Sequence, residues 1–192
     1  MKRAHSALLI IAVVLLSGLF SGCQRTALDL FKENVRKNPN SPKAHNDLAF
    51  QYYQLKKYDD AIKEYQKALE IRPGDFLARN NIAQIYYETG RYQQALDLFN
   101  ELLPKNEKNS LLHNNIGMCF HQMKKYPEAY FEYKKALELN PNNKYSIDGM
   151  KVLKLDMKKA GLAFPPAADK GAAGAQPPVV PAPAPAAKEK AK

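Results

Sequence analysis

Apolar and small residues recur along the middle of the chain with a fixed period. The stretch HNDLA at residues 45–49 returns as RNNIA at 79–83 and as HNNIG at 113–117, a spacing of 34 residues. Other apolar and aromatic residues also recur every 34 residues. Within each unit they are spaced as on the buried face of a helix. A period of this length is typical of stacked supersecondary units, and here it predicts helical hairpins.

The three units share their residue types when Pro42, Phe76 and Ser110 are taken as position one. Small residues occupy positions eight and twenty: Ala49, Ala83 and Gly117, then Ala61, Ala95 and Ala129. Aromatic residues occupy positions eleven and twenty-four: Tyr52, Tyr86 and Phe120, then Tyr65, Phe99 and Tyr133. This pattern resembles the tetratricopeptide repeat family, in which small residues let two helices approach closely and aromatic residues fill the spaces between hairpins. The resemblance implies an all-α solenoid of helical hairpins.

Two partial units extend the array. Ala27, Phe31 and Pro39 match the end of a preceding repeat, so a lone helix is expected before the first hairpin. After Asn143, apolar residues at helical spacing predict a helix that caps the third repeat. The predicted organisation is a signal at 1–22, a lipidated N-terminus with a half-repeat at 23–41, repeats at 42–75, 76–109 and 110–143, a capping helix at 144–162 and a tail at 163–192.

The second repeat departs from the pattern at its end. Leu102 stands where the other repeats have Ala68 and Ala136, and Pro104 follows where the helix should continue. An interior proline costs a helix about 3 kcal/mol or more. We therefore expect this helix to stop near Leu103 and the joint with the third repeat to differ from the first joint.

The N-terminus has the layout of an exported protein's signal. Lys2 and Arg3 precede an apolar run from Ala7 to Leu16 that is too short for a transmembrane helix of about 20 residues. The sequence Phe20-Ser21-Gly22-Cys23 resembles the lipobox of bacterial lipoproteins, although Phe20 replaces the usual leucine. The resemblance implies cleavage before Cys23, which would carry a diacylglycerol and an N-acyl chain, palmitate for example. The alternative is an ordinary signal peptide with an incidental cysteine.

The cysteine count agrees with the lipoprotein interpretation. The chain has two cysteines, Cys23 and Cys119, and an acylated Cys23 could not form a disulfide with the other. Cys119 is then expected to be a buried apolar residue. In Gram-negative lipoproteins an aspartate after the cysteine favours the inner membrane. Gln24 stands there, so the resemblance implies the outer membrane, facing the periplasm.

The C-terminal segment 163–192 is rich in alanine and proline and has a basic end. Its composition predicts a disordered, solvated spacer, with contact to the cell wall or a partner as the alternative. The net charge of +10 becomes +8 without Lys2 and Arg3. Export makes nucleic acid an unsuitable partner, whereas acidic proteins, lipid headgroups and cell-wall polymers fit a basic chain.

In the family the first helix of each repeat lines a concave, partner-binding surface, on which positions two, five, six, nine, twelve and thirteen lie. The residues expected there for partner binding are Asn46, Asp47, Phe50, Tyr53, Asn80, Asn81, Gln84, Tyr87, Asn114, Asn115, Met118 and His121. An amide can satisfy both the N–H and the C=O of an extended peptide. The amides of position six resemble the asparagine ladder of O-linked N-acetylglucosamine transferases. The alternative is that these amides bond to neighbouring helices.

No pattern in the sequence points to an enzyme, a metal site or a bound cofactor. His45 and His113 occupy the same position in different repeats, and His121 follows eight residues after His113 rather than the four that stack two ligands on one helix. We therefore expect a membrane-anchored adaptor of the bacterial envelope that binds partner proteins, in pilus or secretin assembly or in scaffolding cell-wall hydrolases. The alternative is a passive tether or self-associating scaffold.

Overall fold

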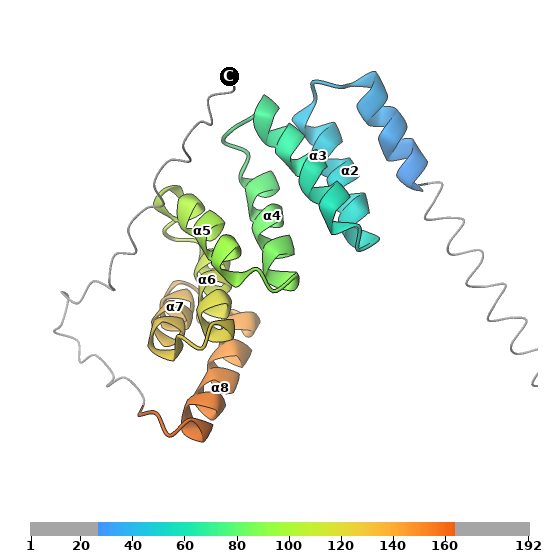
Figure 1. Ribbon diagram of the computed structural model, residues 1–192. Coiled ribbons are helices and arrows are strands. Elements are labelled where there is room, and N and C mark those ends of the chain that lie inside the picture. Colours follow the sequence, from blue (N-terminus) through green and yellow to red (C-terminus); the bar gives the residue numbers. More distant parts are fainter. Residues whose placement is uncertain (1–26, 164–192) are drawn as a thin grey trace, which may run out of the picture. The chain divides into compact units, whose positions relative to one another are not determined.

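The computed structural model describes residues 27–163 of the 192-residue chain (Figure 1). The predicted signal, Cys23 and almost all of the predicted tail lie outside this range. The described residues form a helix at 27–37, followed by α2 (Pro42–Gln54), α3 (Tyr58–Ile71), α4 (Phe76–Glu88), α5 (Tyr92–Leu102), the 3-10 helix η1 (Leu103–Lys105), α6 (Ser110–Gln122), α7 (Tyr126–Leu139) and α8 (Lys144–Lys159). The all-α helical-repeat prediction is confirmed. The chain divides after Ile85, within α4, into two compact units.

In the first unit, α2 and α3 form a packed hairpin. Ser41 caps α2 by accepting a hydrogen bond from the Ala44 amide, and Pro42 is the first helical residue. Asp75 does the same for α4, because its Oδ1 accepts from the amides of Leu77 and Ala78.

The predicted small residues are buried within the hairpin. Ala49 and Ala61 of the first unit are fully buried, and Tyr65 is buried with them. The chain turns at the same repeat position, fifteen, after α2, α4 and α6, with a positive φ at Lys56, Gly90 and Lys124. This left-handed conformation ends a helix without strain only at glycine, so the two lysines carry a modest backbone cost.

In the second unit, α6 packs against both α5 and α7, and α8 covers α6 and α7. The centre of this packing is the ring of Tyr133, which is almost fully buried between two glycines. A Cβ added at Gly117 would lie 2.9 Å from Tyr133 Cδ1, and one added at Gly149 would lie 2.8 Å from its Cε1. Both glycines are therefore required by the close approach of this ring.

The end of the second repeat is irregular, as Pro104 predicted. Helix α5 has 11 residues, whereas α3 and α7 have 14 each, and η1 replaces its last turn. Leu102 is buried there, although the other repeats have alanine. The predicted stop near Leu103 is confirmed.

Helix α8 caps the second unit. Met150, Leu153 and Met157 are buried, and Lys151 and Lys154 are exposed. No helix within residues 27–163 has the length and apolar character needed to cross a membrane.

Candidate functional site

The residues expected to bind partners lie on α2 and the first part of α4 in the first unit, and on the end of α4 and α6 in the second. Apolar side chains among the concave positions are well exposed. Phe50 is 46% exposed, and Leu77 and Leu111, which occupy position two, are each 54% exposed. Each unit thus offers apolar surface on a first helix of its repeat.

Position five of the first repeat is engaged within the fold. Asn46 is buried, and its Nδ2 donates to Asp75 Oδ2 over 3.0 Å. Since Asp75 caps α4, this hydrogen bond ties α2 to the start of the next repeat. The Oδ1 atom of Asn46 is buried and has no hydrogen-bond partner among the described residues.

The other amides of the first unit differ in their partners. Asn81 Nδ2 donates to the Tyr65 hydroxyl over 2.9 Å, which joins α4 to α3. Asp47 accepts from Lys43 over 2.6 Å on the surface of α2. Asn80 is half-buried and makes no side-chain hydrogen bond to a described residue, so its donors and acceptor remain available to a ligand.

Position five of the third repeat, Asn114, has hydrogen-bond partners for both of its polar atoms. Asn114 is buried, and its Oδ1 accepts from the hydroxyl of the fully buried Ser146 on α8 over 3.1 Å. Its Nδ2 faces Asn115 Oδ1 at 3.3 Å and Met118 Sδ at 3.2 Å. Asn114 therefore joins α6 to the capping helix, whereas Asn115 is half-buried and retains its own amide donors.

The remaining predicted contacts of the second unit form links between helices. Gln122 Nε2 donates to the Tyr87 hydroxyl over 3.3 Å, which connects α6 to the end of α4. His121 Nε2 lies 3.1 Å from Asp156 Oδ2 of α8, and its ring meets Tyr133 edge-on. Position twelve thus contributes to both the packing and the polar surface.

Two histidine–glutamate pairs, which the sequence analysis missed, join the helices of the first and third repeats. His45 Nδ1 is 2.7 Å from Glu64 Oε2, and its Nε2 is 2.8 Å from the Pro39 carbonyl oxygen. His113 repeats this arrangement, at 2.7 Å from Glu132 Oε2 and 3.0 Å from the Glu107 carbonyl oxygen. We call each histidine and its carboxylate a His–Glu clamp, since it joins the two helices of a hairpin and the preceding loop.

The clamp restricts where protons lie. A carbonyl oxygen only accepts, so Nε2 of each histidine must donate. The contact of 2.7 Å between Nδ1 and Oε2 holds the other side of each ring to its carboxylate. The sequence signal was present: His45 and Glu64, like His113 and Glu132, are 19 residues apart, at positions four and twenty-three.

Burial and charge shift several pKa values in the core. Burial alone would raise the pKa of the Glu64 carboxyl, but hydrogen bonds from Lys67 and His45 and their charges outweigh it and lower the pKa. Ionised Glu64 contributes stability that is present above the carboxyl's unfolded pKa and is lost as pH falls through the lowered folded value. Burial raises the pKa of Cys119 to about 12, so this free thiol is protonated and unreactive near neutral pH, as expected of an apolar residue.

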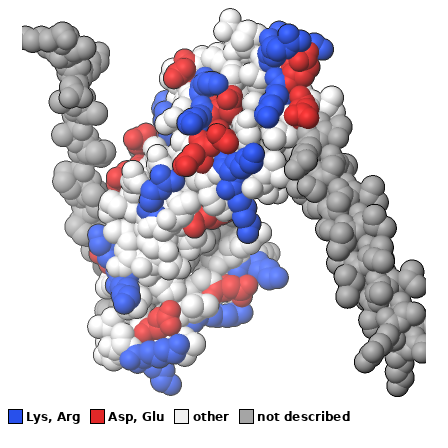
Figure 2. Space-filling view, turned by 45° about the vertical axis from the view of Figure 1, so that its right-hand side comes forward, with Lys and Arg blue, Asp and Glu red and all other residues white. Residues whose placement is uncertain are grey.

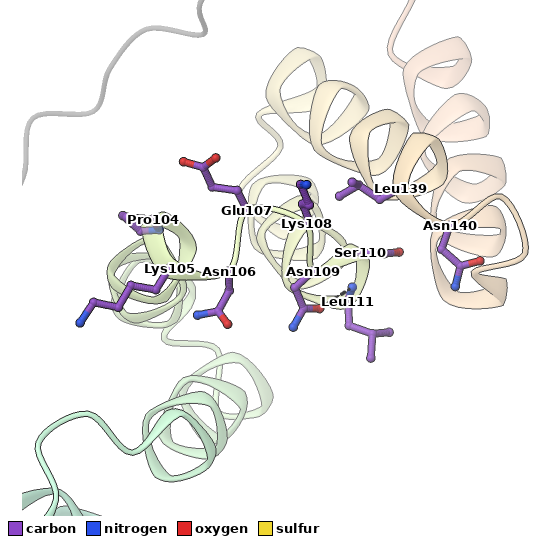
Figure 3. Close-up of a pocket in the computed structure, with 10 residues that line it drawn as sticks. All are labelled: Pro104, Lys105, Asn106, Glu107, Lys108, Asn109, Ser110, Leu111, Leu139 and Asn140. Atoms are coloured by element: carbon purple, nitrogen blue, oxygen red, sulfur yellow. Dashed lines mark hydrogen bonds between the residues drawn. The ribbon is translucent and has the colours of Figure 1, made fainter.

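A surface hollow of about 780 Å³ lies beside η1 in the second unit. Figure 3 shows its lining side chains coming from η1, from the first turn of α6 with the loop before it, and from the end of α7. Its asparagines are used locally, because Asn109 Oδ1 caps α6 and Asn106 Nδ2 donates to the Leu102 carbonyl. These two asparagines therefore serve the local fold rather than the hollow.

Charges are mixed over the visible surface. Figure 2 shows lysine and arginine side chains beside aspartate and glutamate on this face, without one broad patch of a single sign. Among residues 27–163, no three His, Cys, Asp or Glu side chains form a group that could hold a metal ion. The exposed apolar side chains with amides beside them are thus the feature best suited to contact another molecule.

Comparison with known proteins agrees with this architecture. Tetratricopeptide repeat models match residues 40–108 and 110–143. None of the curated proteins compared with the chain matches it.

Solved structures share the fold at low sequence identity. The structure titled "MamA RS-1 ArsTM double mutant" has a TM-score of 0.62 and 23% identity over 74% of this chain and 82% of that one. MamA 41-end from Desulfovibrio magneticus RS-1 has a TM-score of 0.60 and 20% identity over 74% and 86% of the two chains. The first repeat domain of Spaghetti (RPAP3), bound to the HSP90 peptide SRMEEVD, has a TM-score of 0.57 and 22% identity over 61% and 93%. Repeat period, hairpin packing and matched models together place this chain in the tetratricopeptide repeat family.

Proposed function

We propose that this protein is a membrane-anchored adaptor of the bacterial cell envelope that binds segments of partner proteins on the first helices of its repeats. The observation that carries the proposal is a pairing found in both units. An exposed leucine at position two lies on the same helix as an amide with free hydrogen-bonding capacity: Leu77 with Asn80 on α4, and Leu111 with Asn115 on α6.

This pairing suits an extended peptide segment. The leucine offers apolar contact, and the amide can bond to main-chain N–H and C=O groups whatever the peptide's side chains. A structure of the same fold is titled as bound to an HSP90 peptide, which supports a peptide as the partner class. An acidic C-terminus is not the expected ligand here, because Lys43, the basic residue of these positions, is paired with Asp47.

Structural amides can be separated from available ones in the test. Asn80→Ala with Asn115→Ala removes two amides that form no hydrogen bond between helices. Leu77→Ser with Leu111→Ser removes the exposed leucines. The matched control is Leu30→Ser with Asn142→Ala, which changes the same residue types at other exposed positions. Each protein is crosslinked in its native membranes and purified, and its partners are identified by mass spectrometry.

We expect partners that are retained by the control and lost by the four-residue variant, with unchanged circular dichroism. The same partners with both variants would overturn binding by these faces and favour the passive tether. Copies of the chain alone, with a mass that rises with concentration in sedimentation, would favour the self-associating scaffold.

The anchor is tested separately. The proposal includes cleavage before Cys23 and acylation of its sulfur and new amine, with residence in the outer membrane suggested by Gln24. Intact mass of the protein purified from membranes should show the added lipid, and Cys23→Ser should abolish it. An unlipidated mature chain would refute the anchor while leaving the adaptor untouched.

A further inference from the structure

Helix α8 has a second apolar face in addition to the one that packs on α6 and α7. Tyr145 is 71% exposed, Val152 50% and Leu155 52%. We call these three residues the outer stripe. At 100° per residue they fall on one side of the helix, away from the buried Ser146 and Leu153. A capping helix needs one apolar face, so the outer stripe is not explained by the packing.

The same helix is strongly basic. It carries five lysines, Lys144, Lys151, Lys154, Lys158 and Lys159, against two aspartates, Asp148 and Asp156.

The two aspartates are already paired, Asp148 with Lys151 at 3.3 Å, and Asp156 with Lys159 at 3.5 Å and His121 at 3.1 Å. No carboxylate within the described range pairs with Lys144, Lys154 or Lys158. Lys151, Lys154 and Lys158 follow one another at spacings of three and four residues, along a line beside the outer stripe.

We propose that the outer stripe and its lysines dock this end of the protein on the surface of a bilayer that contains anionic phospholipids. Apolar side chains of such a helix enter the boundary between headgroups and acyl chains, while flanking lysines extend toward the phosphates. Tyrosine suits this boundary, since its ring is apolar and its hydroxyl stays hydrated.

A bilayer fits better than a protein segment for a geometric reason. A peptide is anchored by side chains that enter pockets, and the outer stripe lines neither the hollow beside η1 nor the smaller one on α2 and α3. A bilayer needs no pocket, because apolar side chains insert into it from a convex surface. Charge complementarity supplies the rest, since unpaired lysines meet anionic headgroups.

The inference does not depend on the proposed adaptor function. Three apolar side chains and a few lysines give reversible, salt-sensitive binding rather than an anchor. Such a contact would orient the second unit on a membrane surface.

The chain contains no tryptophan, which allows a local test in the full-length protein. Tyr145→Trp places the sole tryptophan of the protein on the outer stripe. The matched control Phe50→Trp places it on α2, at another exposed aromatic position. Emission is recorded with vesicles of phosphatidylcholine alone and of phosphatidylcholine with phosphatidylglycerol, with brominated acyl chains as quencher. Because the reporter senses only its surroundings, binding through the N-terminus does not produce the signal.

The expected result for the Tyr145→Trp protein is a blue shift and quenching of its emission with the anionic vesicles alone, reversed by high salt. The Phe50→Trp protein should show no change. Adding Lys154→Glu and Lys158→Glu should weaken the response by about tenfold or more, since each basic residue near such a surface changes affinity several-fold. Circular dichroism checks that these exposed changes leave the fold intact.

An unchanged emission spectrum of the Tyr145→Trp protein with anionic vesicles would overturn the proposal, as would an equal response to neutral vesicles. A response to a glutamate-rich peptide without one to vesicles would reassign the face to an acidic protein. Loss of partners in the crosslinking test has no bearing on this signal, so failure of the two proposals can be told apart.

Discussion

The hairpins of the first and third repeats contain the same clamp, and the second repeat does not. His45 and His113 each bond a glutamate of the partner helix and a carbonyl of the preceding loop. In the second repeat Arg79 makes the loop contact, donating to the Pro73 carbonyl over 2.9 Å, and position twenty-three is Leu98, which cannot form an ion pair. The loop contact thus recurs in every repeat, while the His–Glu clamp is an addition to two of them.

The two clamped hairpins differ in what their position-five amide does. Asn46 bonds Asp75, which caps the next repeat, and leaves its own oxygen unpaired among the described residues. Asn114 bonds Ser146 of α8 and has partners for both of its polar atoms. Identical residues in equivalent positions therefore have unequal roles, because the element that follows each hairpin is different. The difference between the hairpins can be tested at three positions of the repeat.

The largest effect is expected at the clamp of the third repeat. His113→Ala leaves Glu132 buried without its hydrogen-bond partner, which should lower the free energy of unfolding by about 3–5 kcal/mol. His45→Ala should cost less, about half as much by the same reasoning, because Glu64 keeps its hydrogen bond from Lys67 at 2.8 Å. Urea unfolding followed by circular dichroism measures both.

The control replaces both partners. His113→Leu with Glu132→Leu removes the pair together with its desolvation cost and should recover most of the loss. Equal losses for His45→Ala and His113→Ala would contradict the role given to Lys67.

The sequence predicted the hairpins well because their determinants are local or strictly periodic. Pro104 predicts the end of α5, because a proline interrupts a helix at its own position. The amides were harder to interpret. Residue type and repeat position left open whether they bind a partner or a neighbouring helix, because the hydrogen bonds of Asn114 depend on Ser146, 32 residues away. The His–Glu clamps were missed because helical spacing was considered along single helices and not across a hairpin.

The next effect concerns position eight, where the third repeat has glycine and the first has alanine. Gly117→Ala would place a Cβ 2.9 Å from the Tyr133 ring, which is buried and cannot move freely. We expect a loss of about 1–2 kcal/mol, the overpacking cost less the gain in helix propensity. Thermal unfolding provides the measurement.

The reverse substitution, alanine to glycine, tests position eight of the first repeat. Ala49→Gly has no ring to relieve and should cost about 1–2 kcal/mol, through lower helix propensity and the loss of a buried methyl group. Adding Tyr133→Leu to Gly117→Ala should reduce the penalty of the glycine change. If that penalty is unaltered by the shorter side chain, contact with Tyr133 is not its cause.

The last comparison separates the two amides. Asn114→Ala removes the acceptor of the buried Ser146 hydroxyl and should lower the free energy of unfolding by about 1–2 kcal/mol. Asn46→Ala also removes an oxygen that has no partner among the described residues, and Asp75 still accepts from both amides of α4. The loss of stability in Asn46→Ala should therefore be at most about half of the loss in Asn114→Ala. Since both asparagines are buried, neither change should alter the partners captured by crosslinking. Unchanged stability with a loss of partners in Asn114→Ala would instead make position five a contact surface, as the repeat pattern alone suggested.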